Sequence, residues 1–129
     1  MRVLLDTCAF LWVISDSPRF STAAHKIFTD PANEVYLSAI SSWEIALKNS
    51  IGKLPLPEPN PAEFIADQRK AHGIETLPLE EEASLYIPLL PKLHDDPFDR
   101  LLICQAIVHG LVILTSDRLI RQYPVRTSW

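Results

Sequence analysis

Short hydrophobic runs alternate along this chain with longer segments in which hydrophobic residues recur every three or four positions. The short runs predict strands at residues 3–5, 35–37, 74–77, 111–114 and 125–128. The longer segments predict helices at residues 7–14, 21–28, 38–50, 62–72, 79–90, 97–109 and 117–122. The proline-rich stretch 54–61 predicts a stiff loop, because proline fits neither a helix interior nor a central strand.

The alternation of strands with helices predicts an α/β fold with a parallel sheet covered on both faces. The strand runs lack regular polar alternation, as expected when both faces of a sheet are buried. A chain of 129 residues with 47% hydrophobic residues should form one compact domain, residues 1–129, with its own core. We expect a soluble, cytoplasmic protein, because the N-terminus turns acidic at Asp6 and no apolar stretch approaches the about 20 residues of a membrane span.

Charge and cysteine content narrow the possible functions. The net charge of −4 disfavours a protein that holds nucleic acid by bulk electrostatics, unless bound metal ions neutralise several acids. The two cysteines, Cys8 and Cys104, form neither a disulfide framework nor a zinc pattern, and we expect two small buried thiols.

Four acids stand at the ends of hydrophobic runs: Asp6, Glu44, Asp99 and Asp117. In open parallel sheets, ligands bind beyond the carboxyl ends of the strands, and the strand–helix order brings these four acids to that edge. Converging carboxylates repel each other unless a cation lies among them, and Mg²⁺ takes oxygen ligands of this kind. The pattern therefore predicts a cation site, with Thr7 and Thr115 near enough to orient a water or a carboxylate.

Each acid also has a structural explanation. Glu44 shares a helix face with hydrophobic residues, which favours a functional role, but it could form an ion pair with Lys48 four residues later. Asp99 could support a helix start at which Asp96 is the N-cap. Asp6 and Asp117 could each cap the helix that follows.

The residues in four blocks resemble the PIN domain, and within it the VapC-type toxins of bacterial toxin–antitoxin pairs. The blocks are Leu4-Leu5-Asp6-Thr7, Ser41-Ser42-Trp43-Glu44-Ile45-Ala46, His94-Asp95-Asp96-Pro97-Phe98-Asp99-Arg100-Leu101-Leu102-Ile103 and Leu114-Thr115-Ser116-Asp117. The resemblance covers nearly the whole chain. It implies a three-layer α/β/α sandwich whose central parallel sheet has four to five strands.

The resemblance also implies an endoribonuclease that hydrolyses RNA with Mg²⁺ or Mn²⁺. Asp6, Glu44, Asp99 and Asp117 match the family's acidic metal site, and Asp96 matches an additional acid that could reach a metal through water. Lys48 and Arg100 are candidates for contact with substrate phosphate, with exposure to solvent as the competing interpretation. Toxins of this kind are usually homodimers held inactive by a cognate antitoxin.

Three other functions compete with this interpretation. A haloacid-dehalogenase phosphatase normally carries a second Asp two residues after the first, where this chain has Cys8. A response-regulator receiver needs a phosphorylatable Asp and a late Lys that Leu37-Ser38 and Thr115-Ser116-Asp117 do not supply. A non-catalytic module that binds RNA or a basic partner protein would leave the acids idle, and the intact acidic set argues against it.

Overall fold

The computed structural model describes residues 1–129 and contains a five-stranded sheet in which all strands are parallel. The strand order is β3-β2-β1-β4-β5. The strands are β1 (Arg2–Leu5), β2 (Glu34–Ser38), β3 (Glu75–Leu77), β4 (Val112–Leu114) and β5 (Thr127–Ser128). The predicted α/β architecture is confirmed, with five strands in the sheet.

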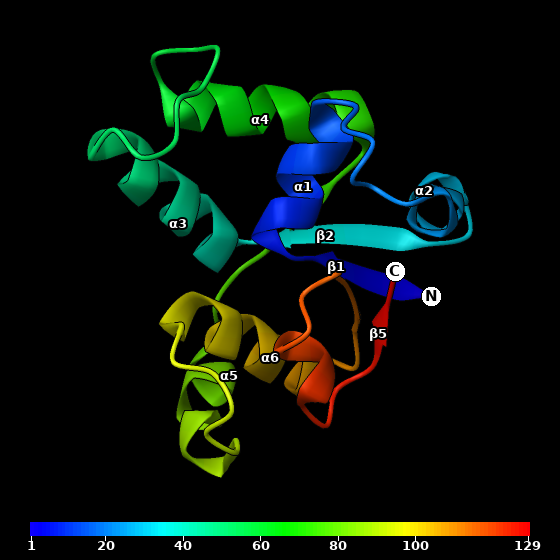
Figure 1. Ribbon diagram of the computed structural model, residues 1–129, viewed down its shortest axis with the longest axis vertical. Coiled ribbons are helices and arrows are strands. Elements are labelled where there is room, and N and C mark those ends of the chain that lie inside the picture. Colours follow the sequence, from blue (N-terminus) through cyan, green and yellow to red (C-terminus); the bar gives the residue numbers. More distant parts are fainter.

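The helices lie on both faces of this sheet (Figure 1). They are α1 (Thr7–Ile14), α2 (Thr22–Thr29), α3 (Ala39–Ser50), α4 (Pro61–His72), α5 (Glu81–Leu85) and α6 (Pro97–His109), with 3-10 turns η1 (Ile87–Leu89) and η2 (Ile120–Gln122). Helices α1, α2 and α4 cover one face, α5 and α6 cover the other, and α3 contributes buried residues to both. The result is a three-layer α/β/α sandwich.

Strand β1 shows why the sheet is central. Val3 and Leu5 point into the core under α1 and α4, whereas Leu4 points into the core over α6, and all three are fully buried. Successive side chains of a strand point to opposite faces, so a continuous hydrophobic run is what a strand covered on both faces requires.

The helix boundaries largely follow the predicted ones because local capping determines them. Helix α6 begins with Asp96 as N-cap and Pro97 in its first turn, and Gly110 ends it with a φ of 67°. Helix α3 begins at the N-cap Ser38, whose hydroxyl accepts a hydrogen bond from the backbone N–H of Ile40. These capping residues stand at the helix ends themselves, so they can be recognised in the sequence.

Two predicted helices are wrong in part. The helix expected over residues 79–90 is two short pieces, α5 and η1, because Pro88 removes a backbone donor and its ring clashes with the preceding turn. The helix expected over residues 117–122 is only the 3-10 turn η2. No helix of the structure is both long and apolar enough to cross a membrane.

A buried polar contact joins the carboxyl end of β2 to α6. The Ser38 hydroxyl donates to Oε1 of Gln105, and the Gln105 amide nitrogen donates to the carbonyl oxygen of Pro78 at 3.2 Å. Both side chains are fully buried. Because a buried polar group is costly to leave without a partner, this contact fixes α6 against the end of the strand.

Replacing Gln105 with leucine should therefore lower the free energy of unfolding by about 1–3 kcal/mol, since Ser38 and the Pro78 carbonyl would lose their partners. Urea titration of the variant measures the change. Gln122→Leu is the matched control, because Gln122 is exposed and the same substitution there should cost less than about 0.5 kcal/mol. Equal stability of Gln105→Leu and the wild type would contradict the assignment.

Candidate active site

The four predicted acids lie around one cavity of about 240 Å³ at the carboxyl edge of the sheet. Asp6 follows β1, Glu44 lies in α3, Asp99 lies in the first turn of α6, and Asp117 follows β4. The lining residues are Asp6, Thr7, Cys8, Glu44, Lys48, His94, Asp96, Asp99 and Asp117. Segments far apart in the sequence therefore deliver carboxylates to a shared space.

Asp6 serves as a helix cap and also faces the cavity. Its Oδ1 accepts a hydrogen bond from the backbone N–H of Ala9 at 2.7 Å, and its Oδ2 accepts one from the hydroxyl of Thr115. The side chain is only 5% exposed. Burial raises the pKa of Asp6 to about 6, with Asp117 and Glu44 adding to the rise and the two hydrogen bonds opposing it.

Glu44 is also 5% exposed, as its place on the hydrophobic face of α3 predicts. Its Oε1 accepts from the Thr7 hydroxyl at 2.7 Å, and the Thr7 oxygen lies 3.0 Å from the Ser41 hydroxyl. Its Oε2 pairs with the ammonium group of Lys48 at 2.5 Å. Glu44 therefore forms the ion pair with Lys48 and also lines the cavity, so the two explanations of this acid hold together. Lys48 is the one lysine or arginine among the residues lining the cavity.

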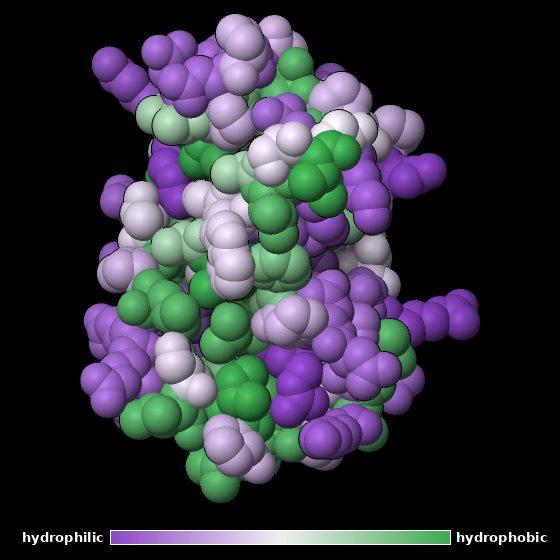
Figure 2. Space-filling model, turned by 90° about the vertical axis from the view of Figure 1, so that its left-hand side faces the viewer, coloured by the Kyte–Doolittle hydropathy of each residue, from purple (hydrophilic) through white to green (hydrophobic).

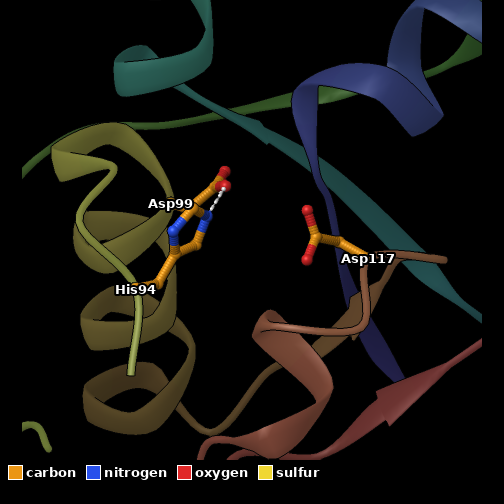
Figure 3. Close-up of side chains that lie close together, drawn as sticks. All are labelled: His94, Asp99 and Asp117. Carbon is orange, nitrogen blue, oxygen red and sulfur yellow. Dashed lines mark hydrogen bonds and ion pairs between the residues drawn. The ribbon is translucent and has the colours of Figure 1, made fainter. Parts of the chain in front are cut away.

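Asp99 lines the cavity beside a histidine (Figure 3). Its Oδ2 is 2.9 Å from Nε2 of His94. Asp96 caps α6, since its Oδ1 accepts from the backbone N–H of Phe98 at 2.9 Å. Burial and the charge of Asp96 raise the pKa of Asp99 well above its ordinary range, and the hydrogen bond from His94 opposes the rise.

Asp117 faces Asp99 and His94 across the cavity (Figure 3). Its Oδ1 accepts from the backbone N–H groups of Leu119 at 2.8 Å and Ile120 at 3.3 Å, and its own N–H donates to the Thr115 hydroxyl at 3.0 Å. One nitrogen or oxygen atom from each of His94, Asp99 and Asp117 can be chosen so that all lie within 4.8 Å of one another. These three side chains therefore share one part of the cavity.

The donor set fits a hard divalent cation. Carboxylate oxygens from four elements surround the cavity, and a single ammonium group, that of Lys48, offsets them. The raised pKa values of Asp6 and Asp99 reflect carboxylates that are poorly solvated and close to other acids. A bound divalent ion would relieve both penalties.

Two other sequence expectations change in the structure. Arg100 lies outside the acidic cavity, and its guanidinium donates to the carbonyl oxygens of Ile87 and Pro91 and to the hydroxyl of Tyr123. Cys104 is buried as expected, but Cys8 is exposed at the cavity wall. Partial burial, together with Asp6 and Glu44, raises the pKa of Cys8 to about 11 and keeps it a thiol.

His94 and Ser41 had no role in the site assigned from the sequence, although both lie in the blocks that resemble the PIN domain. His94 stands two residues before the N-cap of α6, and this short spacing was the signal that could have revealed it. Ser41 lies one turn before Glu44 on α3, so helical spacing places it on the same face. Tyr123 comes from the C-terminal segment, and nothing near it in the sequence connects it to the site.

The raised pKa of Asp6 predicts a pH dependence of stability. Between pH about 4 and about 6 the folded protein binds more protons than the unfolded chain, so the metal-free protein should lose stability as the pH rises through this window. Asp6 should contribute about 1–3 kcal/mol of this loss, so Asp6→Asn should lose that much less stability than the wild type, and the loss that remains should come from Asp99, whose pKa is also raised. Thermal unfolding at pH 4 and pH 7 in EDTA measures it. An identical pH profile for the variant would contradict the electrostatic interpretation.

Comparison with known proteins identifies the family. The PIN domain profile matches residues 3–125. Ribonuclease VapC22 of Mycobacterium tuberculosis is 30% identical over 122 residues, which cover 94% of this chain and 91% of the relative. Ribonuclease VapC16 of the same organism is 41% identical over 54 residues, and that match spans 42% of this chain and 38% of the relative.

Solved structures share the fold. VapBC2 from Rickettsia felis, bound to a DNA fragment from its promoter, has a TM-score of 0.74 at 15% identity and covers 99% of this chain and 98% of its own. VapBC-1 from nontypeable Haemophilus influenzae has a TM-score of 0.66 at 18% identity and covers 99% and 97%. Because the family profile matches nearly the whole chain and the fold agrees, this protein belongs to the PIN domain family.

Proposed function

We propose that this protein is a metal-dependent endoribonuclease that hydrolyses RNA phosphodiester bonds and acts as the toxin of a toxin–antitoxin pair. The observation that carries the proposal is the convergence of four carboxylates from separate elements on one cavity. The relatives named as VapC ribonucleases support the reaction, and the similarity to VapBC proteins supports the toxin assignment. We place the activity in the cytoplasm, where RNA substrates occur.

Asp6, Glu44, Asp99 and Asp117 would hold Mg²⁺ or Mn²⁺, with Asp96 contributing through a water. When bound, such an ion would lower the pKa of a water molecule and neutralise charge that develops on the phosphate. The pKa values of Asp6 and Asp99 are raised by burial and by the neighbouring acids. A bound cation would lower both pKa values and favour the charged carboxylates that coordinate it, which supports this role.

The surrounding side chains hold these acids in place. The hydroxyl of Thr115 donates to Asp6, and the hydroxyl of Thr7 donates to Glu44, so each threonine leaves its acid fewer orientations. Lys48 is half-buried at the cavity and is placed to contact a substrate phosphate there. Arg100 is left out of the phosphate contacts, since it does not line the acidic cavity and both of its terminal nitrogens donate to protein acceptors.

A non-catalytic binding module explains the same site less well. Asp6 and Glu44 are almost completely buried, and a carboxylate in such a place costs stability unless a partner compensates it. A surface that merely bound RNA or a basic tail would need no buried acids. We propose an antitoxin as a regulatory partner, with a basic segment that neutralises the acidic cavity.

We also propose a homodimer, supported by an exposed hydrophobic face. Trp43, Leu47 and Ile51 lie four residues apart on α3 and are 41–57% exposed, and Leu85 and Leu89 near α5 are 67% and 72% exposed. Hydrophobic side chains gather over the lower half of the face in Figure 2. Large exposed hydrophobic patches of this kind mark interaction surfaces.

RNA cleavage tests the proposed reaction. Asp6→Asn or Asp99→Asn should lower the cleavage rate at least about 100-fold, because an amide is a poorer and uncharged ligand for a hard cation. EDTA should abolish cleavage by the wild type, and Mn²⁺ in excess should restore it. A fluorescent RNA oligonucleotide pool measures the rate.

Asp95→Asn is the matched control, because Asp95 is an exposed neighbour outside the acidic cavity. It should cleave at nearly the wild-type rate. Circular dichroism verifies that each variant is folded. Cleavage that survives EDTA, or that both Asp6→Asn and Asp99→Asn retain, would rule out the proposed mechanism.

The dimer has a separate test. Leu85→Glu and Leu89→Glu should place charges in the hydrophobic face and shift the sedimentation behaviour from dimer to monomer. Glu81→Gln, at an exposed acidic position of α5, is the control and should leave the dimer intact. A wild type that sediments as a monomer at all concentrations would refute the dimer.

A further inference from the structure

His94 lies at the candidate site, although it is not an acid and does not belong to a strand or helix. It comes from the segment between η1 and α6, and its ring lines the acidic cavity. Nε2 of His94 lies 2.9 Å from Oδ2 of Asp99 (Figure 3). No protein donor contacts Oδ1 of Asp99, which is the oxygen left for a cation.

The second ring nitrogen indicates which atom carries the proton. The backbone N–H of Asp96 points at Nδ1 of His94 at 3.4 Å. A nitrogen that accepts this contact has a free lone pair, so in the neutral ring the proton is on Nε2. Nε2 therefore donates to Asp99. A histidine that used Nε2 as a metal ligand would carry its proton on Nδ1, facing another donor.

The backbone beside His94 is anchored by a buried tyrosine. The hydroxyl oxygen of Tyr123 accepts from the backbone N–H of His94 at 2.9 Å and from that of Leu93 at 3.1 Å. Tyr123 itself is 4% exposed and packs in the core beneath α6. The guanidinium of Arg100 donates to the same hydroxyl at 3.4 Å and also to the carbonyl oxygens of Ile87 and Pro91.

We propose that Tyr123 and His94 are positioning residues that orient the Asp99 carboxylate for metal binding, with His94 donating to Asp99 rather than coordinating the ion. The chain of contacts runs from the Tyr123 hydroxyl, through the backbone of His94, to Nε2 and then to Oδ2 of Asp99. This inference rests on the proposed metal-dependent function of the same site.

The electrostatics of Asp99 explain why such support is needed. Asp96, Asp6 and Asp117 all oppose a charge on Asp99, and burial opposes it most. The hydrogen bond from His94 is the one contact that favours the charged carboxylate among these influences. Without it, Asp99 would be freer to rotate away from the other acids. Outer partners of metal ligands typically change metal affinity about 10–100-fold.

Titration of Mn²⁺ into the protein at pH 7.5, followed by calorimetry, tests the inference without reference to activity. His94→Leu and Tyr123→Phe should each weaken Mn²⁺ binding by about 10-fold or more. The double variant should bind no more weakly than His94→Leu, because the two residues act through one chain of contacts. His94→Gln, whose amide can donate from a similar position, should recover part of the affinity.

Two matched controls separate positioning from general loss of structure. Tyr36→Phe removes a hydroxyl that donates to Glu34 at the opposite end of the sheet, and His72→Leu removes a ring at the end of α4. Both should bind Mn²⁺ like the wild type. Pulsed electron paramagnetic resonance of the bound ion should show no directly coordinated nitrogen in the wild type.

The possible failures are distinguishable. A wild type that does not bind Mn²⁺ would overturn the proposed metal-dependent function itself. A wild type that binds, with unchanged affinity in His94→Leu or Tyr123→Phe, would overturn only the positioning role. Additive losses in the double variant would also overturn it. A nitrogen signal that disappears in His94→Leu would instead make His94 a direct ligand.

Discussion

Mutual repulsion among buried carboxylates is the interaction on which the site depends. Asp6 and Glu44 are nearly inaccessible to solvent, and Asp99 and Asp117 line the same cavity. Burial and the neighbouring acids raise the pKa of Asp6 to about 6, because this environment opposes a negative charge. The fold tolerates the arrangement because hydroxyls, helix N-termini and one ammonium group each stabilise part of it.

The architecture brings these charges together without any special loop. Parallel strands end at one edge of a sheet, so Asp6, directly after β1, and Asp117, three residues after β4, come to the same edge although 111 positions separate them along the chain (117 − 6 = 111). Helices α3 and α6 start at the same edge and add Glu44 and Asp99 from their first turns or just beyond. The hydrophobic layers on both faces hold the strands in register and thereby fix the spacing of the acids.

The sequence predicted the elements well where the signals are local, and the four acids that it singled out line one cavity. N-caps such as Ser38 and Asp96, and the glycine at position 110, mark helix ends within a few residues. It failed at residues 79–90, where hydrophobic periodicity continues across Pro88 although a helix cannot. It also could not place Tyr123 or assign Arg100, because both act through contacts with residues 9 to 30 positions away.

The same distinction between local and distant signals bears on how the site is organised. The four acids lie in short blocks that a reader of the sequence can recognise, whereas the atoms that orient them come from other parts of the chain. Thr115 reaches Asp6 from the residue after β4, Thr7 reaches Glu44 from α1, and His94 reaches Asp99 from the segment before α6. A substitution at one of these supporting positions removes no carboxylate, yet it changes how well the carboxylates converge. A PIN domain with an intact set of acids can therefore differ in metal affinity from a close relative for reasons that the acidic motif alone does not contain.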